Sequence, residues 1–196
     1  MKTERIININ RKTRETSIEV TLNLSQKGQE IQTKLPFFDH LLSSMSFHGD
    51  FFLKITANGD IDVDPHHLVE DTGIVLGSAL NKIRKDYGAV CRFGHSVIPM
   101  DDALSEIAID VCGRAYCHYE VNFPQQYAGN FDLSLLREFF TGLAGKALIS
   151  IHILGRSGLN SHHMAESIFK ALGKSINQAY KAVDSPAGEM STKGLL

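Results

Sequence analysis

The sequence predicts an α+β protein, an internally duplicated α/β sandwich in which each half has a four-stranded sheet and two helices. The motif His-His-x-x-Glu occurs at 66–70 and again at 162–166, an offset of 96 residues (162 − 66 = 96), and Gly77 recurs as Gly173 at the same offset. Around each copy the expected order is strands, helix, strand, helix. A period near one hundred residues is too long for a solenoid unit, so duplication of a small half is the simpler account.

In the first half, apolar periodicity separates strands from helices. Apolar and polar residues alternate from Ile18 to Leu24, which is typical of a half-buried strand. The Lys27-Gly28 turn predicts that the following segment pairs back as a hairpin. The predicted elements of this half are strands at 6–9, 18–24, 29–34 and 51–57 and helices at 37–48 and 66–87.

The second half repeats this order. Its predicted elements are strands at 96–100, 104–111, 114–121 and 147–154 and helices at 131–145 and 162–180. Because no linker rich in Pro, Gly or Ser separates the halves, we expect one domain overall, divided into half-repeats 1–90 and 91–185. Residues 186–196, with Pro186, Gly188 and Gly194, are expected to be a loop-like C-terminal tail.

Composition narrows the class of protein. Hydrophobic residues make up 43% of the 196 residues, enough for a core, and the net charge of −2 recommends neither nucleic acid nor an anionic membrane as partner. Three cysteines without a Cys-x-x-Cys pair suit a reducing compartment. The N-terminus lacks an apolar signal core and no run reaches membrane-spanning length, so we expect a soluble cytoplasmic protein.

The repeated motif indicates a metal site. Residues three and four apart share a helix face, so Glu70 can lie beside His66 or His67, and Glu166 beside His162 or His163. Imidazole nitrogen and carboxylate oxygen on one face suit a borderline divalent transition metal. A single His-His pair is more often a polar helix start, but two copies at one spacing favour metal binding.

Aligning the first helices of the two halves adds two ligands. Residues 37–42 then lie over residues 135–140, and His40 corresponds to Glu138. If His40 joins the first set of ligands, Glu138 should join the second; otherwise Glu138 is an ordinary surface residue of an amphipathic helix. Eight groups suit two ions with open positions. The candidate ligands are His40, His66, His67, Glu70, Glu138, His162, His163 and Glu166.

Further motifs follow one another in order along the chain: Phe38-Asp39-His40, Gly59-Asp60, Arg92-Phe93-Gly94, Pro99-Met100-Asp101-Asp102-Ala103-Leu104 and Gly113-Arg114. Together with the two His-His segments, they resemble those of the imidazoleglycerol-phosphate dehydratase family. Two departures, Pro65 and Cys112, remove no proposed ligand. The family's fold is two halves like the second domain of ribosomal protein S5. The phosphatase domain fused to this enzyme in some bacteria is absent, so one activity is expected.

The resemblance implies a dehydration in histidine biosynthesis. A carbon–oxygen lyase would convert D-erythro-imidazole glycerol phosphate to imidazole acetol phosphate and water, through a metal-bound imidazolate and a diazafulvene-like intermediate. It also implies two Mn(II) ions per active site. The assembly implied is a homo-oligomer, a 24-mer built from trimers with active sites shared between subunits.

The resemblance also suggests which residues act on the substrate. Glu15 is the candidate proton shuttle and substrate contact, although the sequence alone would make it a strand-edge charge. Asp102 and Glu106 are alternatives, and Asp102 would equally hold a ligand histidine in its tautomer. Asp39 and Asp71 are expected to support neighbouring ligands or helix starts. The phosphate candidates are Arg92, Arg114, Ser191 and Lys193, with the tail 186–196 closing over substrate. Otherwise each arginine is a solvated strand-end charge and the tail is simply disordered.

Two other function classes remain open. His-His-x-x-Glu does not name a reaction, so a metal-dependent hydrolase is one alternative. A metal-storing or structural module with closed coordination spheres is the second. Arg92, Arg114 and Lys193 favour an enzyme with a phosphorylated substrate.

Overall fold

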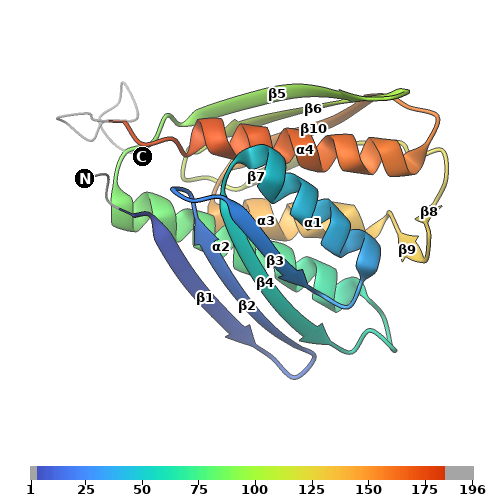
Figure 1. The fold of residues 1–196 in the computed structure, drawn as a ribbon, viewed down its shortest axis with the longest axis horizontal. Coiled ribbons are helices and arrows are strands. Elements are labelled where there is room, and N and C mark those ends of the chain that lie inside the picture. The colour runs from blue at the N-terminus through green and yellow to red at the C-terminus, as the bar shows by residue number, and fades with distance from the viewer. Residues whose placement is uncertain (1–3, 184–196) are drawn as a thin grey trace.

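Two four-stranded sheets lie on the outside of the molecule, with four helices between them (Figure 1). The computed structural model describes residues 4–183. The first sheet has the order β1-β2-β4-β3 and its half contributes two helices. The elements are β1 (Ile6–Lys12), β2 (Thr16–Asn23), β3 (Gly28–Gln32), α1 (Pro36–Gly49), β4 (Phe52–Gly59) and α2 (His66–Tyr87).

The second sheet repeats this topology with the order β5-β6-β10-β7. In both sheets three strands are antiparallel and the last edge strand is parallel to its neighbour. The elements are β5 (Phe93–Met100), β6 (Ala103–Asp110), β7 (Tyr116–Glu120), β8 (Tyr127–Ala128), β9 (Phe131–Asp132), α3 (Leu135–Ala147), β10 (Ser150–Ser157) and α4 (Ser161–Ala179). The predicted fold class is confirmed; the exact boundary between half-repeats at residue 90 stays a prediction.

Helices of one half pack on helices of the other. α2 packs on α3 and α1 on α4, and a cluster of phenylalanine rings joins them. The ring of Phe139 lies 5.6 Å from that of Phe38 and 5.4 Å from that of Phe169, with all three side chains fully buried. Burying aromatic side chains from both halves in one core makes the chain a single structural unit.

Two glycines show that the duplication extends to backbone register. A Cβ on Gly77 would lie 2.3 Å from the carbonyl oxygen of Leu143, and one on Gly173 would lie 2.0 Å from that of Met45. The two glycines are 96 residues apart, and their partners 98 (143 − 45 = 98). The α2–α3 and α1–α4 crossings are therefore equivalent. The same offset of 98 relates His40 to Glu138, which supports the alignment made from sequence.

Among the predicted elements whose pairing or bounds differ from the structure, three differ for a clear reason. The hairpin expected at 29–34 is wrong: β3 pairs in parallel with β4, because β1 and β4 already occupy both edges of β2. The helix expected from residue 131 begins at Leu135, since Phe131 and Asp132 pair with Tyr127 and Ala128. The strand expected from residue 147 begins at Ser150, because α3 continues to Ala147.

Within the described residues, no helix has both the length and the apolar character that crossing a membrane requires.

Candidate metal centre

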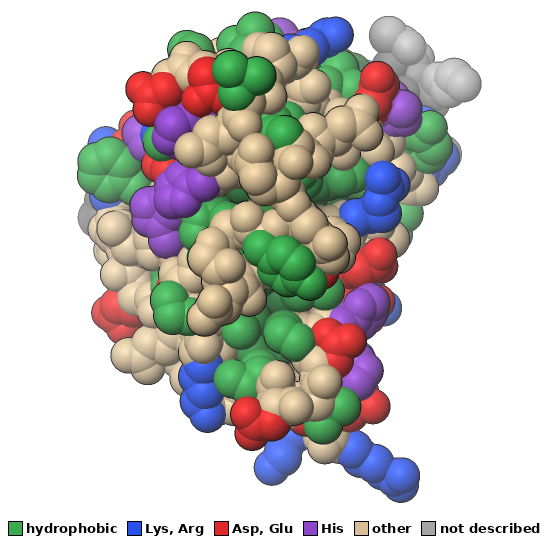
Figure 2. Space-filling model, turned by 90° about the vertical axis from the view of Figure 1, so that its right-hand side faces the viewer, with side chains coloured by type: hydrophobic (Ala, Val, Ile, Leu, Met, Phe, Trp, Pro, Cys, Tyr) green, Lys and Arg blue, Asp and Glu red, His purple; other side chains and the backbone are tan. Residues whose placement is uncertain are grey.

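Three metal-ligating side chains from both halves meet at one end of the helix layer. Nε2 of His40 lies 3.2 Å and Nε2 of His162 lies 3.4 Å from Oε2 of Glu166. Among residues 4–183 this is the one group of three or more such residues whose ligand atoms all lie within 4.8 Å of one another. Figure 2 faces this end, where histidine side chains lie exposed in separate groups with acidic side chains beside them.

The helix crossing explains why these residues meet. His162 and Glu166 are one turn apart on α4, whose N-cap residue Asn160 accepts a hydrogen bond from the backbone N–H of His162. His40 comes from α1, and the ring of Phe37 packs 5.0 Å from that of His162. The expectation that His40 joins the ligands of its own half is corrected, because α1 packs on α4 and brings His40 to the second motif.

The surroundings of Glu166 keep its carboxylate ionised, which suits the binding of a cation. Its side chain is only 11% exposed, and its second oxygen, Oε1, lies 3.0 Å from Nζ of Lys170. Burial acts to raise the pKa of Glu166, but hydrogen bonds and charges from Lys170 and His40 outweigh burial, so the pKa lies below its ordinary value. An ionised carboxylate beside two imidazoles is a donor set that fits a borderline divalent metal ion.

Among the described residues, the first motif brings together one His-Glu pair. Nε2 of His66 lies 3.6 Å from Oε2 of Glu70, one helical turn apart on α2. The neighbouring helix α3 carries Glu138, half-buried, at the position that His40 occupies on α1. A Cβ on Gly142, one turn after Glu138, would lie 2.9 Å from the backbone oxygen of Glu70. Glu138 therefore belongs to the helix that crosses the first motif.

The two histidines of each pair point to different partners. Their rings are nearly perpendicular, at 83° for His66 and His67 and 89° for His162 and His163. The first histidine of each pair faces the motif's glutamate, whereas the second faces a carboxylate at a strand end. Nδ1 of His67 lies 3.3 Å from Asp60, whose hydrogen bond raises the pKa of His67.

Glu15 and Asp102 occupy corresponding places beside the second histidines. Oε2 of Glu15, next to β2, lies 3.9 Å from Nδ1 of His67. Oδ1 of Asp102, between β5 and β6, lies 2.6 Å from Nδ1 of His163. Asp102 also accepts hydrogen bonds from the backbone N–H groups of Leu159 and Asn160. The bond from His163 and these two amides hold the pKa of Asp102 well below its usual range, so Asp102 is a poor proton acceptor.

The remaining acidic candidates have structural partners. Glu106 pairs with Arg156 and His95, and the Arg156 hydrogen bond lowers its pKa. Asp39 accepts two hydrogen bonds from Thr33, which fixes the turn into α1. Asp71 is buried and accepts hydrogen bonds from Arg11 and Thr16. The carboxylates of Glu106, Asp39 and Asp71 are thus each engaged by neighbouring donor groups.

The two arginine candidates for the phosphate lie at the opposite end of the second half. Nε of Arg92 donates to Asp110 at 2.7 Å, and its backbone N–H donates to the oxygen of Ala179, the last residue of α4. Arg114 lies in the turn just before β7, close to the same sheet end. Ser191 and Lys193 lie outside the described residues.

Sequence reasoning missed the segment between β7 and α3. Gln125 exchanges two hydrogen bonds with Ser161 and donates a third to the oxygen of Leu159, so it clamps the start of α4. With Tyr127 it lines a hollow of about 360 Å³ beside His162. The Gln-Gln-Tyr-Ala-Gly run after Pro124 signals a turn, but nothing local indicates its contact with α4.

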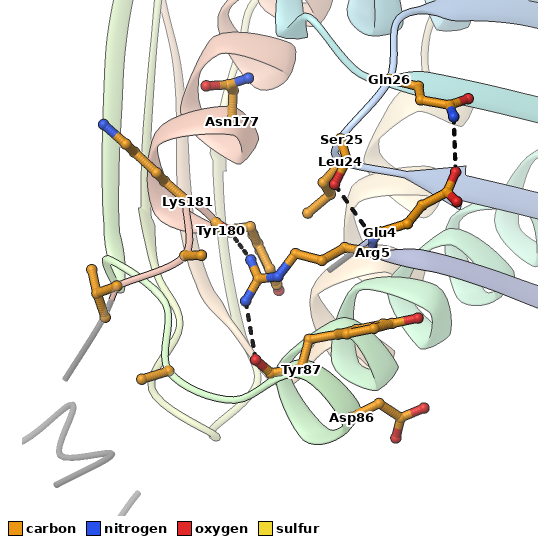
Figure 3. A pocket seen from close by; sticks show the side chains of 13 residues that line it. Glu4, Arg5, Leu24, Ser25, Gln26, Asp86, Tyr87, Asn177, Tyr180 and Lys181 are labelled. Atoms are coloured by element: carbon orange, nitrogen blue, oxygen red, sulfur yellow. Dashed lines mark hydrogen bonds between the residues drawn. The ribbon is translucent and has the colours of Figure 1, made fainter. Parts of the chain in front are cut away.

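A larger hollow lies away from the metal ligands (Figure 3). It has a volume of about 1220 Å³ and surrounds Arg5 near the C-terminal ends of α2 and α4. Arg5 donates hydrogen bonds to the backbone oxygens of Tyr180 and Tyr87, which ties β1 to both helices. We therefore interpret the residues around this hollow as contacts that hold the fold together.

Comparison with known proteins identifies the family. Residues 33–176 match the family model described as imidazoleglycerol-phosphate dehydratase. The chain belongs to the imidazoleglycerol-phosphate dehydratase family. It is 42% identical over 195 residues to the imidazoleglycerol-phosphate dehydratase of Nitrosomonas europaea, covering 98% of both chains. It is 43% identical to that of Herminiimonas arsenicoxydans, covering 100% of both.

Solved dehydratase structures have the same fold. The imidazoleglycerol-phosphate dehydratase of Staphylococcus aureus superposes with a TM-score of 0.82 at 32% identity, covering 91% of this chain and 99% of that one. The Pyrococcus furiosus enzyme, solved in complex with (S)-C348, gives 0.83 at 38% identity, covering 96% and 100%. Fold and sequence therefore place the chain in the dehydratase family over almost its whole length.

Proposed function

We propose that the protein is a cytoplasmic imidazoleglycerol-phosphate dehydratase of histidine biosynthesis. It would convert D-erythro-imidazole glycerol phosphate to imidazole acetol phosphate and water. The observation that supports this most strongly is the cluster of His40, His162 and Glu166, assembled from both halves in a chain of this family. Two Mn(II) ions are the proposed cofactors, one at this cluster and one at His66, Glu70 and Glu138. His67 and His163 are the remaining proposed ligands.

The chemistry explains why the reaction needs metal. The hydroxyl that is lost lies on the carbon attached to the imidazole ring, and the hydrogen that is lost lies on the next carbon, with no carbonyl group to acidify it. When bound, the ions supply Lewis acidity that favours the imidazolate form of the substrate. The hydroxyl on the ring-attached carbon would then take up a proton and leave as water, which would give a diazafulvene-like intermediate. Loss of the proton from the next carbon would give an enol, which relaxes to the ketone.

Glu15 is the proposed proton shuttle. Its carboxylate is exposed, lies 3.9 Å from His67, and belongs to neither His-Glu pair. An accessible carboxylate beside a metal-binding segment can both accept and return a proton. We assign Asp102 the role of a positioning residue, because its hydrogen bonds hold His163 and the start of α4.

The substrate's phosphate would be bound by Arg92 and Arg114, with Ser191 and Lys193 of the tail. Arg92 contacts the end of α4, whereas the metal ligands lie at its start. The 19 residues of α4 span about 28 Å, which is too far for one small substrate. Shared active sites remove this conflict, so we propose a homo-oligomer, a 24-mer built from trimers, in which a neighbouring subunit supplies the arginines.

A reconstitution assay tests this function. Protein stripped of metal with a strong chelator should be inactive, and Mn(II) should restore formation of a ketone that absorbs in alkali. A protein with only the His40→Ala change should remain inactive after the same treatment. Failure of the Mn(II)-loaded wild-type protein to form ketone would refute the proposal.

The same assay separates the two other classes. A hydrolase would release inorganic phosphate or cleave another bond in its substrate, whereas a metal-storing module would bind Mn(II) without turnover. The hollow of about 360 Å³ beside His162 favours a catalyst, because a closed structural site would leave no space for substrate beside its ligands.

A further inference from the structure

We propose that the two metal centres differ in affinity: the centre at His66, Glu70 and Glu138 fills first, and Lys170 weakens the centre at His40, His162 and Glu166. This inference rests on the proposed function, because it requires that both centres bind metal. It adds a loading order and names a positioning residue that acts through a ligand.

Lys170 shares the carboxylate of Glu166 with the metal ligands. Its Nζ lies 3.0 Å from Oε1 of Glu166, while Oε2 faces His40 and His162. The Lys170 side chain is only 19% exposed, and its Nζ also lies 3.3 Å from Sδ of Met100. Because Lys170 is half-buried, solvent and salt screen its positive charge less than they screen the charge of a surface lysine.

The first motif has no such cation at the corresponding place. The offset of 96 places Ile74 where the second motif has Lys170 (170 − 96 = 74), one turn after Glu70. A Cβ on Gly142 of α3 would lie 3.1 Å from Cγ1 of Ile74, so this side chain packs against the opposite helix. An apolar side chain beside Glu70 leaves the full negative charge of that carboxylate to the metal.

The ligand sets differ in charge in the same direction. With Glu138 as a proposed ligand beside Glu70, the first centre has a formal charge of −2, because Ile74 adds none. At the second centre Glu166 contributes −1 and Lys170 contributes +1, which gives 0, because His40 replaces the second carboxylate. Two negative charges against none favour tighter binding of a divalent cation at the first centre.

The sign of the Lys170 effect follows from its charge. A carboxylate hydrogen-bonded to a ligand histidine raises the basicity of that ligand, and losing such a partner costs about 10–100-fold in metal affinity. An ammonium group on a ligand carboxylate does the opposite, since it competes for the lone pairs and repels the cation. Removing Lys170 should therefore tighten binding at the second centre.

Manganese titration of the full-length, metal-free protein tests the inference. Free Mn(II) is measured by electron paramagnetic resonance and the heat of binding by calorimetry. The wild-type protein should show a tight and a weak class of site that differ by about tenfold or more. Glu70→Gln should remove the tight class and Glu166→Gln the weak class, which assigns each class to a centre.

Two pairs of variants isolate the charge. Lys170→Met should tighten the weak class by about tenfold, and Lys170→Arg should leave it unchanged because the charge is retained. The reciprocal change Ile74→Lys should weaken the tight class, with Ile74→Met as the control for side-chain volume. Lys170→Met decides the question even where Ile74→Lys does not fold.

The possible results separate a failure of this inference from a failure of the proposed function on which it rests. Two classes of site that do not respond to Lys170→Met, or a weak class that weakens further, would overturn the role of Lys170. A single affinity at both centres would overturn the loading order. Absence of any Mn(II) binding to the folded wild-type protein would overturn the proposed function as well.

Discussion

His40 and Glu166 come from different halves of the chain, yet Nε2 of His40 lies 3.2 Å from Oε2 of Glu166. This contact exists because α1 crosses α4, so neither half can form the cluster alone. Metal binding at this centre therefore depends on the packing of the two halves as well as on the ligands themselves.

Replacing His40 should remove the metal from this centre while the fold is kept. The imidazole is exposed, so His40→Ala leaves no cavity, and the loss of a direct ligand should exceed the roughly 10–100-fold that an outer partner contributes. Metal analysis of the purified variant should find the Glu70 centre alone occupied. His118→Ala, on the outer face of the second sheet, is the control and should keep both ions.

The glycine crossings should be sensitive to a single methyl group. In Gly173→Ala the new Cβ would lie 2.0 Å from the oxygen of Met45, so α1 and α4 must separate, at a cost of about 3 kcal/mol in the free energy of unfolding. Separation also moves His40 away from Glu166, so Mn(II) affinity should fall. Gly145→Ala is the control, because its Cβ meets nothing within 4 Å and should stabilise α3 by about 0.5–1 kcal/mol. Urea denaturation measures both; equal stability of the two variants would contradict the close crossing.

The sequence predicted the strand and helix order well because apolar periodicity is a local property. It could not place β3 at the edge of β4 or bring His40 to the second motif, since both depend on which edges and helix faces are free in the folded protein. The repeat gave Glu138 as the counterpart of His40, and the glycine crossings have the same register. No local sequence pattern indicates that Gln125 hydrogen-bonds to the start of α4.

Glu15→Gln should separate catalysis from metal binding. The amide keeps the shape of the side chain but cannot accept a proton, so kcat should fall by about 10²–10⁴-fold. Both ions and the assembly should be retained, because Glu15 belongs to neither His-Glu pair. Glu19→Gln, exposed on the adjoining strand β2, is the matched control. Wild-type turnover in the Glu15 variant would remove this residue from the mechanism.

Asp102→Asn should alter the acid stability of the metal-free protein. The pKa of Asp102 is held below its ordinary value, so the ionised carboxylate stabilises the fold above the unfolded pKa, and this contribution is lost as pH falls through the folded pKa. The difference in unfolding free energy between wild type and variant should be constant above about pH 5 and should shrink below about pH 4. Denaturation across this range measures it, with exposed Asp62→Asn as control. A difference that grows toward low pH would contradict the assigned ionisation.

Mixed assemblies should recover activity if the site is shared between subunits. Arg92 contacts the end of α4 and His162 lies at its start, about 28 Å apart for a helix of 19 residues. Arg92→Ala and His162→Ala should each be inactive alone, but co-expressed chains carrying different tags should pair an intact arginine with an intact histidine in about a quarter of the sites. Co-expression of His162→Ala with Glu166→Gln is the control and should stay inactive at the centre that both residues build. No recovery from the first mixture, in assemblies shown by their tags to contain both chains, would place the phosphate site within one subunit.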